Sequence, residues 1–447
     1  MALSSFRPLR SRNFALVWSA ALVSNVGSWM QTVALGFVIT ASTHQPLWTG
    51  LVAAAAFLPM GLLAPVGGAL ADRLDRRRWL IVTTVAEACV AAALAALAAA
   101  GHAPPAVLVG VAFLGGTAAA IGFPAYQAML PDLVPREDLL AAVSLSSAQF
   151  NLGRVIGPAL AGVVLHLPSD AWAFAVNAAS FGAVVVALVF VRLPAPARPS
   201  AVVERIVRRI VAGARVAAAE PGCRSAILLI AVVALIGSPF IGLVPAVAIE
   251  GLHRGAAATS ALVTGQGIGA VAGALALAPL ARRFGRRRLL VGALFAFAGA
   301  IVAYGFAPSL ATATVAIVVV GTCYIGVLTG LNTVVQLRAP EQARGRVLGL
   351  YMMALGTIYP IGLVIQGAIA GVVGIRDVTV ASGVLLFTVM AGLLVIRPGL
   401  FEALEDGETV TADTAVAVAV AGAAPVVSAD PTPGVTAQPT PPSAAAS

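Results

Sequence analysis

The sequence predicts an all-α membrane protein with 12 transmembrane helices, because of its composition, its long apolar segments and the placement of its arginines. Of the 447 residues, 60% are hydrophobic and only 10% are charged, and the mean hydropathy is +0.98. A soluble domain carries about 25% charged residues, so this chain could not cover a water-exposed surface of its size. The composition therefore excludes a soluble enzyme.

Apolar segments long enough to cross a bilayer recur along most of the chain. A spanning helix needs roughly 20 predominantly apolar residues. The first such segment is too long for a signal peptide, and no small-residue cleavage site precedes a polar mature domain. The expected spans are 14–40, 48–71, 79–100, 106–129, 140–166, 172–192, 224–249, 258–281, 289–307, 310–337, 346–373 and 378–397.

Arginine placement predicts the orientation of these spans. If the N-terminus is cytoplasmic, 24 of the 27 basic residues fall on the inner side, only Arg254 and Arg376 fall outside, and Arg154 lies within a span. Such asymmetry places both termini in the cytoplasm of a bacterial cell, in a multi-pass plasma-membrane protein. The net charge of +9 is then an orientation signal, and no nucleic-acid partner is expected. All four histidines fall at the outer ends of spans and are interpreted as interfacial residues, with a pH-sensing role as the alternative: His44, His102, His166 and His253.

The spans divide into two sets of six, and the sets repeat a basic motif. Residues 72–78 follow the second span, and a similar arginine-rich segment, residues 282–288, follows the eighth. Parallel six-helix repeats of this kind place a substrate path at the interface between the halves. We expect an N-terminal bundle over 1–192, a linker over 193–223, a C-terminal bundle over 224–398 and a disordered acidic cytoplasmic tail over 399–447.

The linker contains a short amphipathic segment. Val203 and Val207, with Ile206 and Ile210, form an apolar stripe beside arginines. We expect a cytoplasmic helix that lies on the anionic lipids of the inner leaflet, with a protein docking site as the alternative.

The loop after the second span carries the strongest local motif. Residues 67–78 read GGALADRLDRRR and resemble the signature loop of the major facilitator superfamily, G-x-L-a-D-r-x-G-r-k, with Asp75 in place of the second glycine. The resemblance covers about residues 10–397 and implies the major facilitator fold, in which two pseudo-symmetric six-helix bundles face each other. It further implies that Asp72 faces the start of helix eleven, near Arg346, in a conformational latch of the outward-facing state. The expected latch residues are Gly68, Asp72, Arg73, Arg76 and Arg346; for Arg76 to Arg78, simple positive-inside anchors are the alternative.

Span five carries a second motif. Residues 153–162 read GRVIGPALAG and are similar to the antiporter motif of the superfamily's exporters, g-x-x-x-G-P-x-x-G-G, with Ala161 replacing one glycine. Its glycines permit tight helix packing, and its proline permits a kink. The motif favours export over import, and residues 27–34 and 131–135 resemble the branch of enterobactin exporters and macrolide-type efflux proteins. The motif residues are Gly153, Gly157, Pro158 and Gly162.

Two ionisable side chains stand well inside predicted spans, and such residues are functional candidates because a charge at mid-bilayer is costly. Glu87 in span three is the candidate proton carrier, with a structural role near the cytoplasmic side as the alternative. Arg154 shares a helix face with Ser147 and Asn151 and is expected to face the cavity. It could bind an anionic substrate or keep a carboxylate ionised, but it could not itself release a proton. The structural alternative is an Arg154 bonded to carbonyls near the Pro158 kink.

Uncharged polar residues at helical spacing suggest a mostly apolar cavity with a few hydrogen-bonding groups, which suits a bulky amphiphilic substrate. Each of these residues taken alone is more often a contact between helices. The candidates for the cavity, besides Arg154, are Asn25, Ser28, Gln31, Thr32, Tyr126, Gln127, Ser147, Asn151, Asn332 and Gln336.

The sequence thus predicts a secondary active transporter rather than an enzyme. It holds no phosphate-binding loop of the G-x-x-x-x-G-K-[ST] type and no metal-ligand cluster, so no metal or cofactor is expected. The expected function is export of a small amphiphilic molecule (a drug, a siderophore or a secondary metabolite) by proton antiport through alternating access, performed by a monomer. The alternatives are a gradient-driven importer of a small metabolite and a non-transporting membrane sensor or scaffold.

Overall fold

The computed structural model describes residues 6–101, 103–191 and 206–405, and this part of the chain is built of helices. Twelve helical segments are long and apolar enough to cross a membrane, which confirms the predicted number. Their bounds lie within a few residues of the predicted spans because apolar length alone decides where a chain can cross a bilayer. The predicted start of the linker helix and the predicted acidic tail beyond 405 lie outside the described residues.

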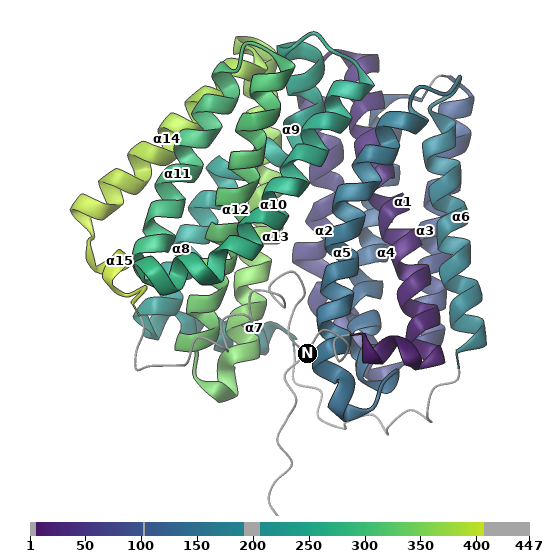
Figure 1. Ribbon diagram of the computed structural model, residues 1–447, viewed down its shortest axis with the longest axis horizontal. Helices are drawn as coiled ribbons and strands as arrows, with labels where there is room; N and C mark the ends of the chain where they lie inside the picture. The colour runs from purple at the N-terminus through teal and green to yellow at the C-terminus, as the bar shows by residue number, and fades with distance from the viewer. Residues whose placement is uncertain (1–5, 102, 192–205, 406–447) are drawn as a thin grey trace, which may run out of the picture.

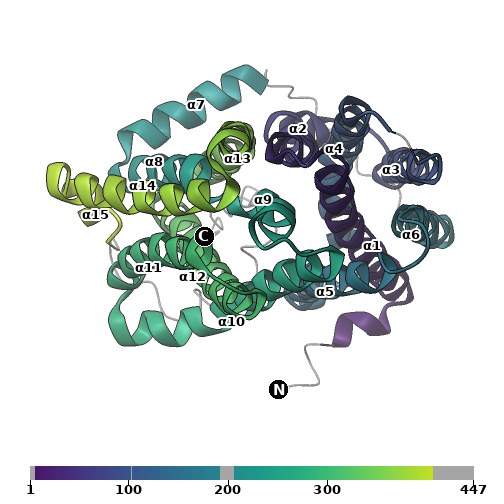
Figure 2. The same ribbon diagram turned by 90° about the horizontal axis from the view of Figure 1, so that it is seen from above.

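The spanning helices form two groups that stand side by side (Figures 1 and 2). The first group, here the N-terminal half, consists of α1 (Arg12–Thr43), α2 (Pro46–Arg73), α3 (Arg76–Ala99), α4 (Pro105–Met129), α5 (Leu139–Val164) and α6 (Ala171–Phe190). The second group, the C-terminal half, contains α10 (Ala256–Phe284), α11 (Arg286–Phe306), α12 (Leu310–Arg338), α13 (Arg344–Val373) and α14 (Ile375–Ile396), and begins with a span that is not uniformly α-helical.

That first span of the C-terminal half runs from Pro221 to Gly251 and contains two π-helical segments. It is built from α8 (Pro221–Val232), η4 (Val233–Gly237), α9 (Phe240–Ala246) and η5 (Val247–Gly251). A π-helical turn leaves backbone carbonyls without their usual partners, and these must be satisfied inside a membrane. The Gln366 amide nitrogen on α13 donates to the carbonyl of Ile236 at 2.7 Å and so satisfies part of this backbone.

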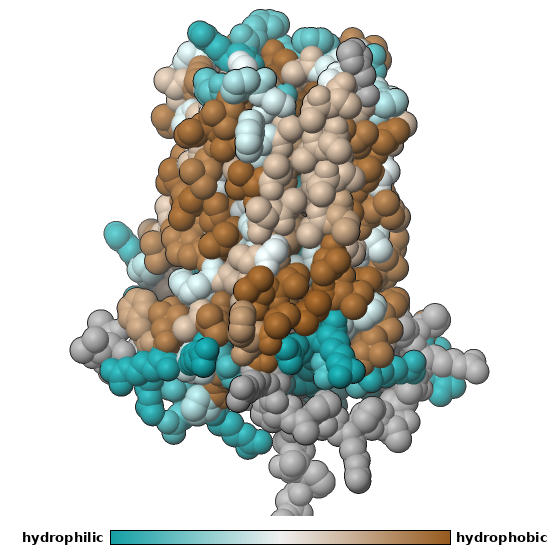
Figure 3. Space-filling view, turned by 90° about the vertical axis from the view of Figure 1, so that its right-hand side faces the viewer, coloured by the Kyte–Doolittle hydropathy of each residue, from teal (hydrophilic) through white to brown (hydrophobic). Residues whose placement is uncertain are grey.

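The molecule has an apolar middle and two polar ends (Figure 3). We call the end that carries the loops after α2, α4, α10 and α12 the basic end, since the arginine-rich loops lie there, and the opposite end the far end. Large apolar side chains such as Leu114, Val319 and Leu385 are exposed along the middle. An exposed apolar band of this kind matches a protein surrounded by lipid.

Charged residues at the basic end bond specific helix ends. Asp75 caps α3 by accepting a hydrogen bond from the backbone N–H of Arg78 at 2.8 Å. Arg76 donates to Asp132 at 3.1 Å, and Arg77 donates to the carbonyls of Leu188 and Val189 at the end of α6. Cations beside unpaired C-terminal carbonyls are favourable. Arg76 and Arg77 therefore position α3 against α4 and α6, which goes beyond general positive-inside anchoring.

The linker helix α7 (Ile206–Ala219) packs against α8 and the start of α13. Gly213 and Ala217, four residues apart, are buried, and Gly213 lies against the backbone of Arg346. Arg208 and Arg215 are exposed. One face of the helix thus covers protein, and the arginines point away from it.

The packed C-terminal half extends past the predicted boundary at residue 398. A short helix, α15 (Gly399–Glu402), buries Phe401, and Leu404 is buried after it. Glu405 forms an ion pair with Arg287 at 3.2 Å. The prediction of a disordered tail from 399 placed the boundary too early, because Phe401 and Leu404 are buried in the C-terminal half and Glu405 pairs with Arg287.

Glu220 joins the linker to the C-terminal half. Its carboxylate caps α8 by accepting from the backbone N–H of Cys223 at 2.5 Å, and it pairs with Arg338 of α12 at 2.8 Å. Burial alone would raise the pKa of this carboxyl group. The hydrogen bonds from the Cys223 and Gly222 backbone, together with Arg338, outweigh that effect and leave the pKa of Glu220 below its usual range.

We predict that Glu220→Gln lowers the stability of the detergent-solubilised protein at pH 7 by about 1–2 kcal/mol, because it removes a charged cap and an ion pair. A carboxyl group with a lowered pKa stabilises the fold above its unfolded pKa of about 4.3, and this contribution is lost as the pH falls through the lowered value. Thermal unfolding at pH 7 and at pH 4 measures both effects. Glu341→Gln, on an exposed carboxylate at the same end, is the control; an equal loss in both variants would contradict this account.

Candidate functional site

The two halves meet along helix pairs, α2 with α13 and α5 with α10, and this boundary is here called the seam. On α2, Gly50 lies against the backbone of Leu363, and Gly61 lies against Gly356. A side chain at either glycine would collide with backbone atoms of the other half. Small residues allow such approach between membrane helices, where van der Waals contact replaces hydrophobic attraction.

The predicted antiporter motif lies at this seam and contacts two helices. Gly153 and Gly157 lie against the α1 backbone, within the N-terminal half. Pro158 accepts a hydrogen bond from the Ser260 hydroxyl of α10, and Gly162 lies against the same serine. Through this motif, one face of α5 packs on the N-terminal half and the adjacent face packs on the C-terminal half.

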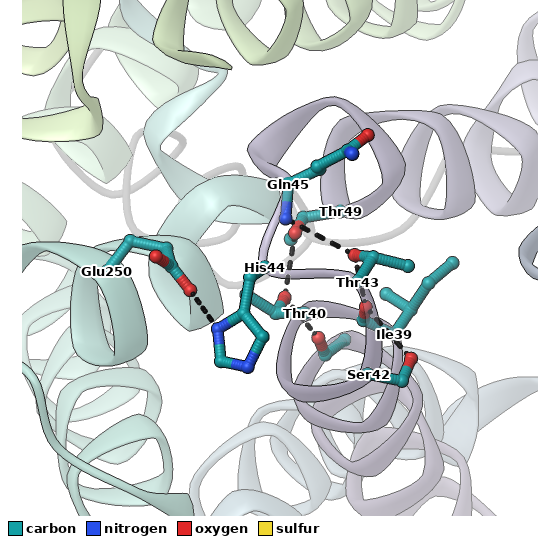
Figure 4. A network of polar contacts seen from close by, with 9 residues as sticks. Ile39, Thr40, Ser42, Thr43, His44, Gln45, Thr49 and Glu250 are labelled. Carbon is teal, nitrogen blue, oxygen red and sulfur yellow. Dashed lines mark hydrogen bonds and ion pairs between the residues drawn. The ribbon is translucent and has the colours of Figure 1, made fainter.

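A polar pair also joins the halves at the far end (Figure 4). The Nδ1 atom of His44 lies 2.9 Å from the Glu250 carboxylate, which is part of η5. His44 adopts a left-handed conformation with φ of 51° and ends α1, so that its ring extends toward the C-terminal half. Thr40 and Thr49, whose hydroxyls are 2.7 Å apart, join α1 and α2 behind it. Such a turn fixes the direction of the His44 side chain.

The two groups of helices stand further apart at the basic end than at the far end (Figure 1). Gly68, one of the expected latch residues, has open space around it, and Asp72 and Arg73 are exposed. Between described residues of the two halves, polar contacts occur at His44–Glu250 and Pro158–Ser260, both toward the far end. In this conformation the seam is closed at the far end, and Asp72 does not bond to the start of α13.

Arg154 is the predicted ionisable residue that reaches the seam. Its backbone carbonyl lies beside Gly267 of α10, and its guanidinium carbon is 5.7 Å from the centroid of the Trp29 ring. Tyr324 of α12 and Tyr359 of α13, both in the other half, lie near its side chain. Its Nε is buried, and the guanidinium donates no hydrogen bond to any described residue. The alternative in which carbonyls near Pro158 bind Arg154 is therefore wrong for this conformation.

Glu87 lies elsewhere in the N-terminal half. It stands at the middle of α3, which packs on α4 and α6 rather than on the C-terminal half. It is half-buried and has no hydrogen bond or ion pair within the described chain. The structure thus separates the two intramembrane candidates: Arg154 lies at the seam, and Glu87 lies on a helix that does not form the seam.

Most of the uncharged cavity candidates contact neighbours in their own half. Gln31 accepts from the Asn177 amide at 2.9 Å, between α1 and α6, and Tyr126 lies 3.5 Å from the Gln149 amide oxygen. Ser147 is buried with no partner for its hydroxyl among described residues. The remaining contacts stay within one helix or between adjacent helices: Thr32 to the Ser28 carbonyl, Asn151 to the Ser147 carbonyl, Gln336 to Asn332, and Asn25 against Gly153, while Gln127 is half-buried.

Sequence reasoning missed the aromatic rings beside Arg154 and the far-end pair. Trp29 and Phe150 form an edge-to-face pair at 6.0 Å in the N-terminal half. Across the seam, Phe57 of α2 packs edge-to-face on Tyr359 at 5.4 Å. Aromatic residues scattered through apolar spans carry no sequence signal that distinguishes a seam position from a lipid-facing one.

Known proteins resemble this chain over most of its length. A family of transmembrane secretion effectors within the major facilitator superfamily matches residues 3–423. The multidrug efflux pump Tap of Mycolicibacterium fortuitum is 28% identical over 81% of this chain and 90% of its own length. The enterobactin exporter EntS of Citrobacter koseri is 28% identical over 80% of this chain and 85% of its own.

The fold also matches a solved structure. A bacterial homologue of the human lysosomal transporter Spinster, in an inward-facing and unoccupied conformation, superposes with a TM-score of 0.70 at 15% identity, over 89% of this chain and 97% of that one. At that identity the likeness concerns the fold. These bacterial relatives are transporters rather than enzymes, and the twelve spans make the chain a multi-pass protein of the inner membrane. The chain belongs to the transmembrane secretion effector family of the major facilitator superfamily.

Proposed function

We propose that this protein exports a small amphiphilic molecule, such as a drug, a siderophore or a secondary metabolite, by proton antiport through alternating access. The observation that carries the proposal is the seam, which is closed at the far end, diverges at the basic end and holds an unpaired arginine between the halves. Rocking of one half against the other would open and close access to such a site. The relatives named as an efflux pump and a siderophore exporter support the outward direction.

The orientation and surroundings of the protein form part of this proposal. The basic end, with both termini, faces the cytoplasm, where arginines are favoured and anionic lipids are available. Exposed arginines on α7 such as Arg208 and Arg215 would contact those lipids. Two six-helix halves supply a complete seam within one chain, so a monomer suffices for transport.

Export can be tested against its alternatives in cells. A deletion strain and an overexpression strain are compared over a panel of amphiphilic drugs, with export expected to raise tolerance on overexpression. If the protein is an importer, its overexpression would make cells more sensitive to the drugs. If it is a sensor or scaffold, accumulation of radiolabelled compound in everted vesicles would be the same with and without the protein. Either result would overturn the proposal.

We predict that His44→Ala shifts the protein toward conformations that are open at the far end. The pair between His44 and Glu250 joins the halves there, and an exposed pair of this kind contributes about 0.5–1 kcal/mol, or a two- to fivefold change in the ratio of conformers. Spin labels at the exposed positions Pro168 and Pro308, on a cysteine-free background, report the far-end distance distribution.

The matched control for that measurement is His166→Ala. His166 is also a far-end histidine, but it bonds to the Gly162 carbonyl of its own half at 2.5 Å. We expect no change in the distance distribution for this variant. A His44→Ala distribution identical to that of the wild type would show that the pair contributes nothing to closure.

We predict that Asp72→Asn impairs turnover while insertion into the membrane stays intact. Asp72 is exposed in this conformation, which is closed at the far end. The substitution should therefore destabilise the conformation that is open at the far end, in which the proposed latch between Asp72 and the start of α13 forms. Efflux in everted vesicles should fall several-fold at unchanged protein level, whereas Glu402→Gln, on another exposed carboxylate at the basic end, should have no effect. Full efflux by Asp72→Asn would argue against the latch.

We predict that Glu87→Gln uncouples efflux from the proton gradient. Glu87 is a carboxylate at the middle of a span with no ion pair in the described chain, so a neutral side chain should be tolerated structurally while proton binding is lost. Gradient-driven efflux in proteoliposomes should fall to the level seen with a protonophore, whereas counterflow without a gradient should persist. Unchanged gradient-driven efflux would assign the proton to another group.

A further inference from the structure

Arg154 is a formal charge at the seam for which the described protein supplies no counter-charge. The carboxylates of the spanning segments lie near helix ends, except Glu87, which stands on α3 away from the seam. Those near the ends include Asp132 and Glu250, which pair with Arg76 and His44. A buried charge without a partner is costly, and its removal from water is normally offset by an ion pair and hydrogen bonds.

The surroundings of this cation are aromatic on both sides. In the N-terminal half, the guanidinium lies over Trp29, which contacts Phe150. In the C-terminal half, Tyr324 lies 5.6 Å from Phe240, ring centroid to centroid, and Tyr359 packs on Phe57. Rings stack favourably on other rings, and the free edge of a guanidinium provides a planar set of donors for a carboxylate, phenolate or sulfonate.

We propose that this part of the seam binds a small aromatic anion, with its anionic group on Arg154 and its ring system among Trp29, Tyr324 and Tyr359. The proposal rests on the proposed export function and narrows its substrate class. A neutral aromatic compound would leave the Arg154 charge unpaired, and a cation would be repelled by it. An anion supplies the absent counter-charge and acceptors for the buried Nε at the same time.

Binding can be measured on the purified full-length protein in lipid nanodiscs, with empty nanodiscs subtracted. Two fluorescent probes share one aromatic framework: 8-anilinonaphthalene-1-sulfonate, which is anionic, and N-phenyl-1-naphthylamine, which is neutral. We expect wild-type protein to bind the anion at least tenfold more tightly than the neutral probe. Equal affinity, preference for the neutral probe or no saturable binding of the anion would overturn the proposal, and this comparison requires no variant.

Substitution then assigns the selectivity to Arg154. Arg154→Gln should weaken binding of the anion at least tenfold and change binding of the neutral probe less than twofold. Arg154→Lys keeps the charge but not the planar donors, so it should give an intermediate loss. Arg136→Gln, at an exposed arginine near the start of α5, removes the same charge outside the seam and should match the wild type.

If Arg154 served only as a structural partner of the Trp29 ring, Arg154→Gln would weaken the binding of both probes equally. This outcome would also overturn the proposal. Size-exclusion profiles and thermal unfolding identify variants that fail to fold. If the Arg154 variants fail to fold, the preference of the wild-type protein for the anionic probe tests the proposal by itself. The drug panel described above measures export independently. Loss of anion selectivity with intact export would reject the substrate class alone, and absence of export would reject the proposed function.

Discussion

Direct backbone contact between the two halves, from the far end to the middle of α2, is the constraint on which the rest of the structure depends. Lipid gives apolar helices little reason to associate, so the seam must be held by close packing and a few polar contacts. Gly50 and Gly61 on α2 provide the packing, and His44 and Ser260 provide polar contacts to the opposite half. Such a boundary can separate and re-form because no broad hydrophobic core is divided by it.

The antiporter motif illustrates how a few residues serve two boundaries. Gly153 and Gly157 hold α5 against α1, whereas Pro158 and Gly162 lie against α10 of the other half. A movement of the halves would therefore change one face of α5 and leave the other unchanged. Arg154 stands between these two contacts, so the motif also determines how the guanidinium is presented to the seam.

The fold could be predicted from the sequence because its main determinant, apolar length, is local. The cap that Asp75 forms on α3 was not predicted, because the resemblance to the signature loop gave this position only as a replaced glycine. The far-end pair could not be predicted, because His44 and Glu250 lie 206 residues apart and meet only through the relation of the halves. The polar candidates were only partly distinguishable: Gln31 and Arg154 both lie in apolar helices, yet Gln31 bonds within its half and Arg154 reaches the seam.

The uncompensated charge of Arg154 has an electrical consequence. If the seam binds an anion, the loaded protein is neutral at this site and the empty protein carries one positive charge. The membrane field then acts on the step in which the empty protein changes sides, and little on the step that carries cargo. A charge that crosses the full potential gains about 2.3 kcal/mol per 100 mV. A cell interior that is negative would thus accelerate the return of the empty carrier, and the membrane voltage would set how often the pump is ready for its next substrate.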